Sequence, residues 1–112
     1  MKLVLQEDLP LQEVSHDPDI KKKVFLNKGD IPHLMMFSTA TFTPGQSVET
    51  HKHDTMTEVF YIQKGMAEFT VEGKKYILKQ GHCITIEAGE WHSQKNPFDA
   101  DVTWLYFGVD VG

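Results

Sequence analysis

Apolar and polar residues alternate along this chain with the two-residue period of β-strands, and the longer period of helices is absent. From residue 24 onward, short apolar or alternating runs are separated by turn-forming glycine, proline and asparagine. The pattern predicts strands over residues 23–27, 34–43, 58–63, 66–71, 74–78, 82–86, 92–95 and 102–109. About eight strands in roughly 90 residues is typical of a sandwich or a closed barrel, so an all-β fold with antiparallel pairing is expected.

The first fifth of the chain has a different composition. Residues 6–20 are rich in acids and contain two prolines, which predicts an irregular N-terminal arm over about 1–20. The lysine run at 21–23 is interpreted as a solvated strand edge that discourages aggregation. A chain of 112 residues fits a single domain, 1–112, with its functional core over about 24–110.

The charge balance limits the classes of partner. A formal net charge of −5 argues against nucleic acid and against an anionic membrane surface. All 11 basic residues are lysines, so the bidentate guanidinium that usually clamps carboxylates and phosphates is missing. This disfavours a phosphorylated or dicarboxylate substrate, although lysines and backbone amides remain available to bind anions.

Two further features concern the cellular setting. Cys83 is the only cysteine, which excludes an intrachain disulfide, and we interpret it as a small apolar residue within a strand. The apolar run at residues 3–5 is too short for a signal peptide or a membrane span. A cytoplasmic location is therefore expected.

Histidines and a glutamate at short spacing form the most informative feature of the sequence. His51 and His53 are two residues apart, so on an extended strand both imidazoles would point to the same face. Glu58 follows after a short loop, and His92 follows the glycine turn at Gly89. Neutral imidazoles together with a carboxylate suit a divalent first-row metal, which makes His51, His53, Glu58 and His92 candidate metal ligands.

The same two-residue period places other side chains beside these candidates. Phe60 and Ile62 share the face of Glu58, so we expect them to line a cavity below the metal. Gln94 and Asn96 share the face of His92, and either would line the cavity or orient the ligands. Aromatic residues of the last strand, such as Trp104, suit either a pocket or ordinary core packing, and core packing is the better default.

Two segments resemble the signatures of the cupin superfamily. The first signature is Gly-x5-His-x-His-x3,4-Glu-x6-Gly, which Gly45, His51, His53, Glu58 and Gly65 match without a gap. The second is Gly-x5-Pro-x-Gly-x2-His-x3-Asn, which is matched by Gly81, Gly89, His92 and Asn96. Glu87 stands where the second signature has proline, and this departure bears on the local turn rather than on the metal site.

The resemblance implies a double-stranded β-helix, or jelly-roll barrel, of two antiparallel sheets. It also implies one divalent transition metal (iron, manganese, nickel, zinc or copper) held by the four candidate ligands. Two adjacent positions would stay open on a six-coordinate ion. Small cupins commonly form homodimers, and residues 2–27 offer strands that could extend a neighbour's sheet.

Function is less constrained than fold, because cupins include many activities. The first hypothesis is an enzyme that acts on a small organic molecule at a mononuclear metal, with a dioxygenase-like reaction as the first class to test. A metal-dependent isomerase or decarboxylase is an alternative. A non-catalytic module that binds or senses a small molecule is another, because no second constellation suggests an acid, a base or a nucleophile.

Overall fold

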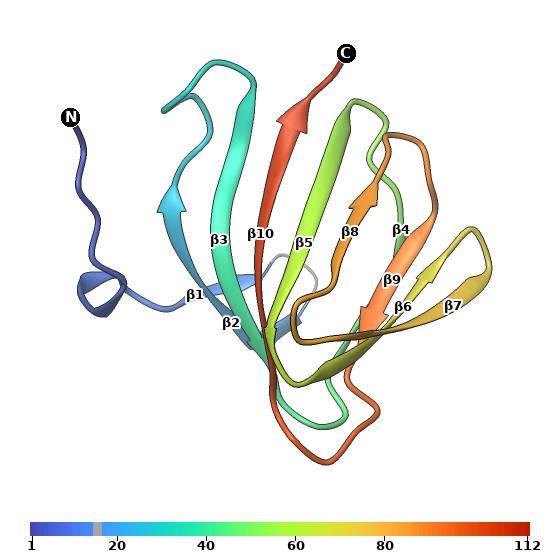
Figure 1. Ribbon diagram of the computed structural model, residues 1–112. Coiled ribbons are helices and arrows are strands. Elements are labelled where there is room, and N and C mark those ends of the chain that lie inside the picture. Colours follow the sequence, from blue (N-terminus) through green and yellow to red (C-terminus); the bar gives the residue numbers. More distant parts are fainter. Residues whose placement is uncertain (15–16) are drawn as a thin grey trace.

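The computed structural model describes residues 1–14 and 17–112, with Asp17 and Pro18 described by their backbone alone. Within these residues, ten strands and one short 3-10 helix form two antiparallel sheets that fold into a barrel (Figure 1). The predicted all-β architecture is confirmed. No helix in the described chain has the length and hydropathy needed to cross a membrane.

One sheet has six strands in the order β1-β2-β3-β10-β5-β8. Its strands are β1 (Gln12–Val14), β2 (Asp17–Leu26), β3 (Leu34–Phe42), β10 (Val102–Asp110), β5 (Met56–Lys64) and β8 (Cys83–Ile86). The other sheet has four strands in the order β4-β9-β6-β7. Its strands are β4 (Ser47–His51), β9 (His92–Lys95), β6 (Met66–Val71) and β7 (Lys74–Lys79).

The core is built by the alternation that the sequence shows. Along β5, every second residue from Met56 to Ile62 is buried, whereas Tyr61 is exposed. The buried aromatic side chains of β3, β5, β6 and β10 contact one another between the sheets, with Phe42 4.4 Å from Trp104 between ring centroids. These contacts fix the barrel on which the functional side chains are mounted.

The N-terminal region differs from the prediction. Instead of an irregular arm over about 1–20, the structure has a short 3-10 helix, Gln6–Asp8, and then β1 and β2. β2 starts well before residue 23, and Ile20 and Val24 on it are buried. The lysine run concealed this strand, because Lys21 and Lys23 alternate with inward-facing positions and give the segment the composition of a solvated edge.

The turn between β5 and β6 depends on glycine. Gly65 has φ of +83°, and a side chain there would meet the backbone carbonyl of Asp101, with the Cα of Val102 at 3.0 Å. This close approach joins the turn to the start of β10 at the lower end of the barrel in Figure 1. Glycine at this position of the first cupin signature is therefore required by both backbone conformation and space.

Candidate metal centre

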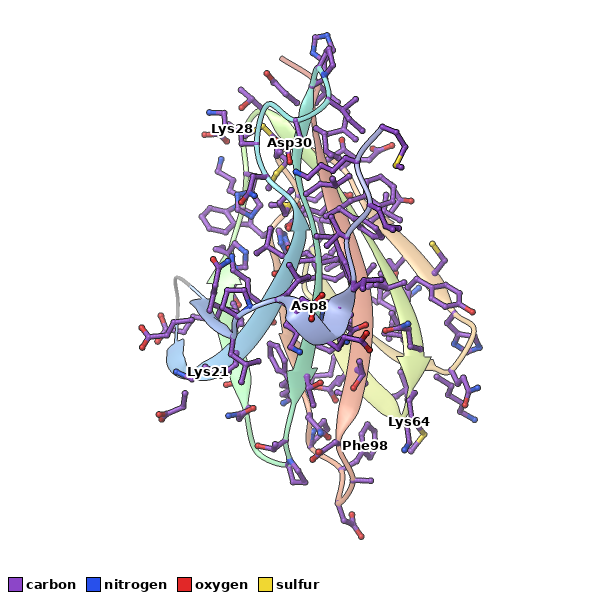
Figure 2. All side chains as sticks on the ribbon, turned by 90° about the vertical axis from the view of Figure 1, so that its left-hand side faces the viewer. Asp8, Lys21, Lys28, Asp30, Lys64 and Phe98 are labelled. Carbon is purple, nitrogen blue, oxygen red and sulfur yellow. The ribbon has the colours of Figure 1, made fainter. Side chains whose placement is uncertain are left out.

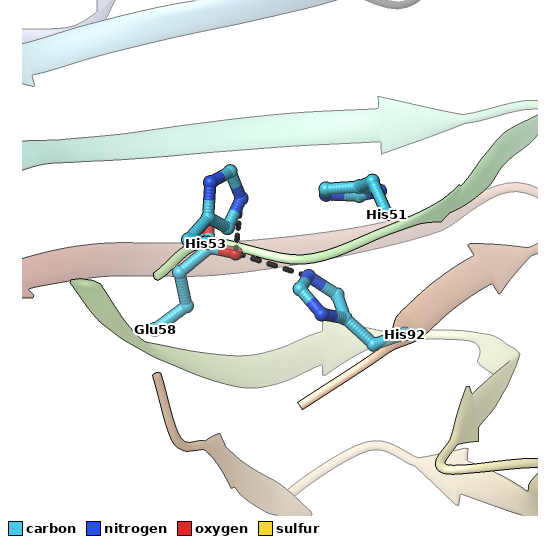
Figure 3. Close-up of side chains that lie close together, drawn as sticks. All are labelled: His51, His53, Glu58 and His92. Carbon is cyan, nitrogen blue, oxygen red and sulfur yellow. Dashed lines mark ion pairs between the residues drawn. The ribbon is translucent and has the colours of Figure 1, made fainter. Parts of the chain in front are cut away.

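Four side chains, three from the two sheets and one from the loop between β4 and β5, converge inside the barrel. One ligand atom from each of His51, His53, Glu58 and His92 lies within 4.8 Å of the others (Figure 3). His51 is the last residue of β4 and His92 the first residue of β9, and the two are directly paired across the four-stranded sheet. Glu58 reaches the same point from β5 of the opposite sheet.

His53 arrives there by a different route from the one predicted. β4 ends at His51, so the two histidines do not share one extended strand. The ladder between β4 and β9 ends there, and the chain then turns toward β5. The amide of Gly89 donates a hydrogen bond to the carbonyl of His53 at 2.8 Å, which holds the loop. The His51 and His53 rings still meet, with centroids 5.0 Å apart.

Backbone carbonyls orient two of the imidazoles. His51 Nδ1 donates to the carbonyl of Glu49 at 2.7 Å, and His92 Nδ1 donates to the carbonyl of Glu90 at 2.9 Å. Because a carbonyl only accepts, both rings carry their proton on Nδ1 and present the Nε2 lone pair to the centre. His92 Nε2 is buried without a hydrogen-bond partner of suitable geometry, although Glu58 Oε1 lies 3.3 Å away.

The electrostatics of Glu58 favour a cation at this point. Burial of its carboxyl group opposes ionisation, but the imidazoles of His53, at 3.2 Å, and of His92, at 3.3 Å, outweigh burial and lower the pKa to about 2. Burial lowers the pKa of His92, whereas Glu58 and the Glu90 carbonyl raise it, with a net rise. An ionised carboxylate facing a buried, unpartnered imidazole nitrogen fits a divalent first-row metal.

The turn before His92 accommodates the glutamate that replaces the signature proline. The amide of Glu87 donates to the Glu90 carboxylate at 2.7 Å, a hydrogen bond that proline could not make. The amide of Glu90 donates back to the carbonyl of Glu87 at 3.1 Å, and Gly89 has φ of +87°. The turn is thereby closed, and the Glu90 carbonyl is left in position to accept from His92.

A cavity of about 130 Å³ lies next to the four ligands. Phe60 and Gln94 line it, as the sequence predicted, but Ile62 does not. Ile62 lies four residues beyond Glu58 on β5 and is fully buried in the core. The residues that line the cavity are Val14, Lys22, Met36, Ala40, Phe42, Val48, His51, His53, Met56, Glu58, Phe60, Gln94, Trp104 and Tyr106.

Three other residues have roles that the sequence did not separate. Trp104 packs in the core and also lines the cavity, so both interpretations of the last strand hold. Asn96 does not line the cavity; its amide donates to the carbonyls of Phe42 and Ala100 and braces the barrel. Cys83 lies within a strand, as expected, and is exposed on the edge strand β8.

Sequence analysis missed the contribution of β2 to the cavity. Lys22 and Val14 line it from the N-terminal hairpin, a segment interpreted as irregular or solvated. The signal was the alternation of Ile20, Lys22 and Val24, whose apolar members mark the inward face. The hairpin therefore belongs to the functional site as well as to the sheet.

Comparison with known proteins agrees with this architecture. A model of the cupin domain matches residues 38–108. The chain is 34% identical over 70 residues to an oxalate-binding protein of Thermotoga maritima, a match that covers 62% of this chain and 58% of that protein. It is 28% identical over 88 residues to the pectin degradation protein KdgF of Dickeya dadantii, covering 79% of this chain and 74% of the relative.

The same fold occurs in solved structures. A crystal structure described as a predicted oxalate decarboxylase from Thermotoga maritima superposes with a TM-score of 0.90 at 24% identity, covering 98% of this chain and all of that one. The match of the domain model spans both signature segments and all four candidate ligands. The chain belongs to the cupin domain family.

Proposed function

We propose that this protein binds one divalent first-row metal through His51, His53, Glu58 and His92, and that the metal holds a small organic acid in the adjoining cavity. The observation that carries the proposal is the convergence of four ligand atoms within 4.8 Å beside that cavity. The buried His92 Nε2, which has no hydrogen-bond partner, supports it because a bound cation would satisfy that atom.

The size and lining of the cavity favour a small ligand. Its volume of about 130 Å³ is below the roughly 300–1,000 Å³ typical of sites for drug-sized molecules. Its walls are mostly apolar, with a few polar groups that include Gln94 and Tyr106. The relative named as an oxalate-binding protein supports an organic acid as the ligand class.

A bound metal would supply Lewis acidity or activate dioxygen, since four protein ligands leave positions open on a six-coordinate ion. The chain's own residues would orient the ligand and exclude water. Phe60 and Trp104 give the cavity apolar walls beside the centre. Burial raises the pKa of Tyr106 to about 12, so its phenol stays protonated and can donate a hydrogen bond to the ligand.

We infer that the protein is an enzyme. Oxygen-dependent turnover is the first activity to test, and decarboxylation and isomerisation are tested after it. One observation favours non-catalytic binding as a second candidate. Apart from the four ligands, Lys22 and Tyr106 are the titratable side chains among the described residues that line the cavity. A tyrosine whose pKa is raised to about 12 is poorly matched to proton transfer at neutral pH.

The test uses protein purified without an affinity tag or chelator. It is loaded separately with Fe²⁺, Mn²⁺, Ni²⁺, Zn²⁺ and Cu²⁺, and oxalate is titrated into each form by calorimetry. We expect binding to at least one loaded form and none to metal-free protein. Oxygen uptake and product analysis on the same samples then separate an enzyme from a binding module. Equal oxalate binding with and without metal would contradict the proposal.

A further inference from the structure

Lys22 points into the barrel. Its neighbours two residues away on β2, Ile20 and Val24, are both buried, so the three side chains share the inner face. Across the sheet Lys22 pairs with Ala40, which in turn pairs with Trp104. Since directly opposed residues in antiparallel strands lie on one face, and both partners line the cavity, the lysine projects toward it.

The charge of Lys22 is not matched within the barrel. Among the described residues, no carboxylate forms an ion pair with it, whereas its neighbour Lys21 pairs with Glu13 on the outside at 3.5 Å. Figure 2 shows Lys21 at the outer edge of the molecule, on the side of the N-terminal arm. Lys22 is thus the one lysine among the described residues that line the cavity.

A second polar group in the cavity also lacks a partner. Gln94 is more than nine-tenths buried, lines the cavity, and has a side-chain amide oxygen with no hydrogen-bond partner among the described residues. Buried polar atoms are normally paired, so an unpaired amide oxygen indicates a hydrogen-bond donor in the filled cavity, such as a water molecule beside the ligand. Gln94 on β9 and Lys22 on β2 belong to opposite sheets and therefore border the cavity from both sides.

Charge counting indicates what kind of ligand would fit. With a divalent metal bound, the cavity would hold two positive charges from the metal, one from Lys22 and one negative charge from Glu58. The excess of two positive charges in a largely apolar cavity is best balanced by a dianion. The strands of Lys22 and Glu58 are three positions apart in the sheet, about 14 Å along it, so a second anionic group would lie away from the metal.

We propose that Lys22 is a specificity-determining residue that selects a dicarboxylate, with one carboxylate on the metal and the other on the Lys22 ammonium. This inference rests on the proposed metal-dependent binding of an organic acid. It revises the expectation that a chain without arginine disfavours dicarboxylates, because one inward lysine replaces the missing guanidinium.

The test compares dianions with monoanions on Mn²⁺-loaded protein. Oxalate, malonate and succinate are titrated by calorimetry against acetate and propionate, with wild type, Lys22→Met, Lys22→Arg and Lys21→Met. Lys21→Met removes the same charge from the adjacent, outward-facing position of the same strand. Elemental analysis of each variant measures metal content, and thermal unfolding measures folding.

We expect the best dicarboxylate to lose about 10- to 100-fold in affinity in Lys22→Met, the effect of removing one hydrogen bond to a charged group. Monocarboxylate affinity and metal content should be unchanged, and Lys22→Arg and Lys21→Met should keep the preference for dianions. Wild-type dicarboxylate affinity in Lys22→Met would overturn the assignment and mean that the ammonium reaches solvent at the barrel rim. If Lys22→Met does not fold, Lys22→Arg provides the test. Loss of the preference for dianions in Lys22→Arg would then overturn the assignment of Lys22.

Failure of the two proposals can be told apart. Wild-type protein that holds Mn²⁺ but binds dicarboxylates no tighter than acetate would overturn the role of Lys22 and leave the metal site intact. Wild-type protein that does not retain Mn²⁺ and binds no carboxylate would overturn the proposed function, and the role of Lys22 with it.

Discussion

At the scale of single residues, one oxygen atom lies at the middle of the candidate metal centre. Glu58 Oε1 lies 3.2 Å from His53 Nε2 and 3.3 Å from His92 Nε2, so one carboxylate oxygen faces both imidazoles. Backbone carbonyls already fix the rings of His51 and His92. The ligands are therefore oriented before a metal arrives, which reduces the ordering that metal binding requires.

At the proposed metal centre, proton binding would oppose metal binding. In metal-free protein the raised pKa of His92 contributes stability that is fully present below 6.5 and is lost as the pH rises through the raised value. The lowered pKa of Glu58 contributes stability that is present above 4.5 and is lost as the pH falls toward about 2. Metal requires neutral imidazoles, so its contribution changes in the opposite direction over the histidine range.

We therefore predict that the stabilisation given by metal decreases as the pH falls from 8 to 5. Calorimetric melting temperatures of loaded and metal-free protein should converge over that range, because protons displace the metal from the histidines. Glu58 remains ionised throughout and should add little to the slope. A difference in melting temperature that stays constant between pH 8 and pH 5 would show that histidines do not hold the metal.

The sequence was sufficient to predict that the four candidate ligands lie together, but it predicted only part of their surroundings. The spacing of His51, His53, Glu58 and His92 was sufficient because ligand convergence is encoded in the loops between adjacent strands. The period of two identified Phe60 as inward-facing, and it identified Ile62 equally well. The two-residue alternation tells which face of a strand a side chain is on, but not how far along the barrel it lies. It therefore could not distinguish a residue that lines the cavity from one in the core.

At the scale of elements, the turn over residues 87–90 shows how a departure from the signature is compensated. The Glu90 carboxylate accepts a hydrogen bond from the Glu87 amide, a donor that proline lacks. We predict that Glu90→Ala lowers the free energy of unfolding by about 1 kcal/mol, because the hydrogen bond is lost at a half-buried position.

In a Glu87→Pro background the same Glu90→Ala change should cost close to nothing, because the donor is already absent. A double-mutant cycle by urea denaturation measures the coupling, with Glu90→Gln as the control that retains an acceptor. Equal costs of Glu90→Ala in the two backgrounds would mean that the hydrogen bond does not stabilise the turn.

The turn at Gly65 gives a second element-scale prediction. Gly65→Ala combines a left-handed backbone with a clash against the Asp101 carbonyl, whereas Gly45, at φ of +90°, has open space around its Cα. Gly45→Ala should cost about 1–2 kcal/mol for conformation alone. Gly65→Ala should cost at least about 1 kcal/mol more because of the added steric conflict. Equal losses in denaturant titrations would show that the neighbouring backbone moves aside.

The elements also show where sequence patterns fail. Strands 66–71 and 92–95 were predicted with the bounds of β6 and β9, because apolar residues and turn signals flank them clearly. β2 was recognised only from residue 23, because its outward positions are lysines that hide an apolar inner face. Long-range pairing with β3, which the local sequence does not report, completes the strand.

At the scale of the whole molecule, the N-terminal arm extends away from the barrel (Figure 1), and several of its apolar side chains are exposed. Leu3, Leu5 and Leu11 are 76%, 47% and 65% exposed, and β1 is an edge strand. An edge next to exposed leucines favours pairing with a second copy. We predict that multi-angle light scattering at tens of micromolar detects a homodimer. The double variant Leu3→Glu/Leu5→Glu should shift the equilibrium toward monomer. A monomeric wild type would contradict this.

The central claim is that three histidines and Glu58 hold one metal ion per chain. Elemental analysis of protein purified without an affinity tag or chelator tests it most directly, with His53→Ala as the variant, since its ring is one-third exposed and its loss should leave the barrel folded. His33→Asn is the control, because His33 is an exposed histidine whose positive φ asparagine tolerates. We expect about one transition-metal ion per chain in wild type and His33→Asn, and at least a tenfold weaker retention in His53→Ala. Equal metal content in wild type and His53→Ala, or none in either, would contradict the assignment of this centre.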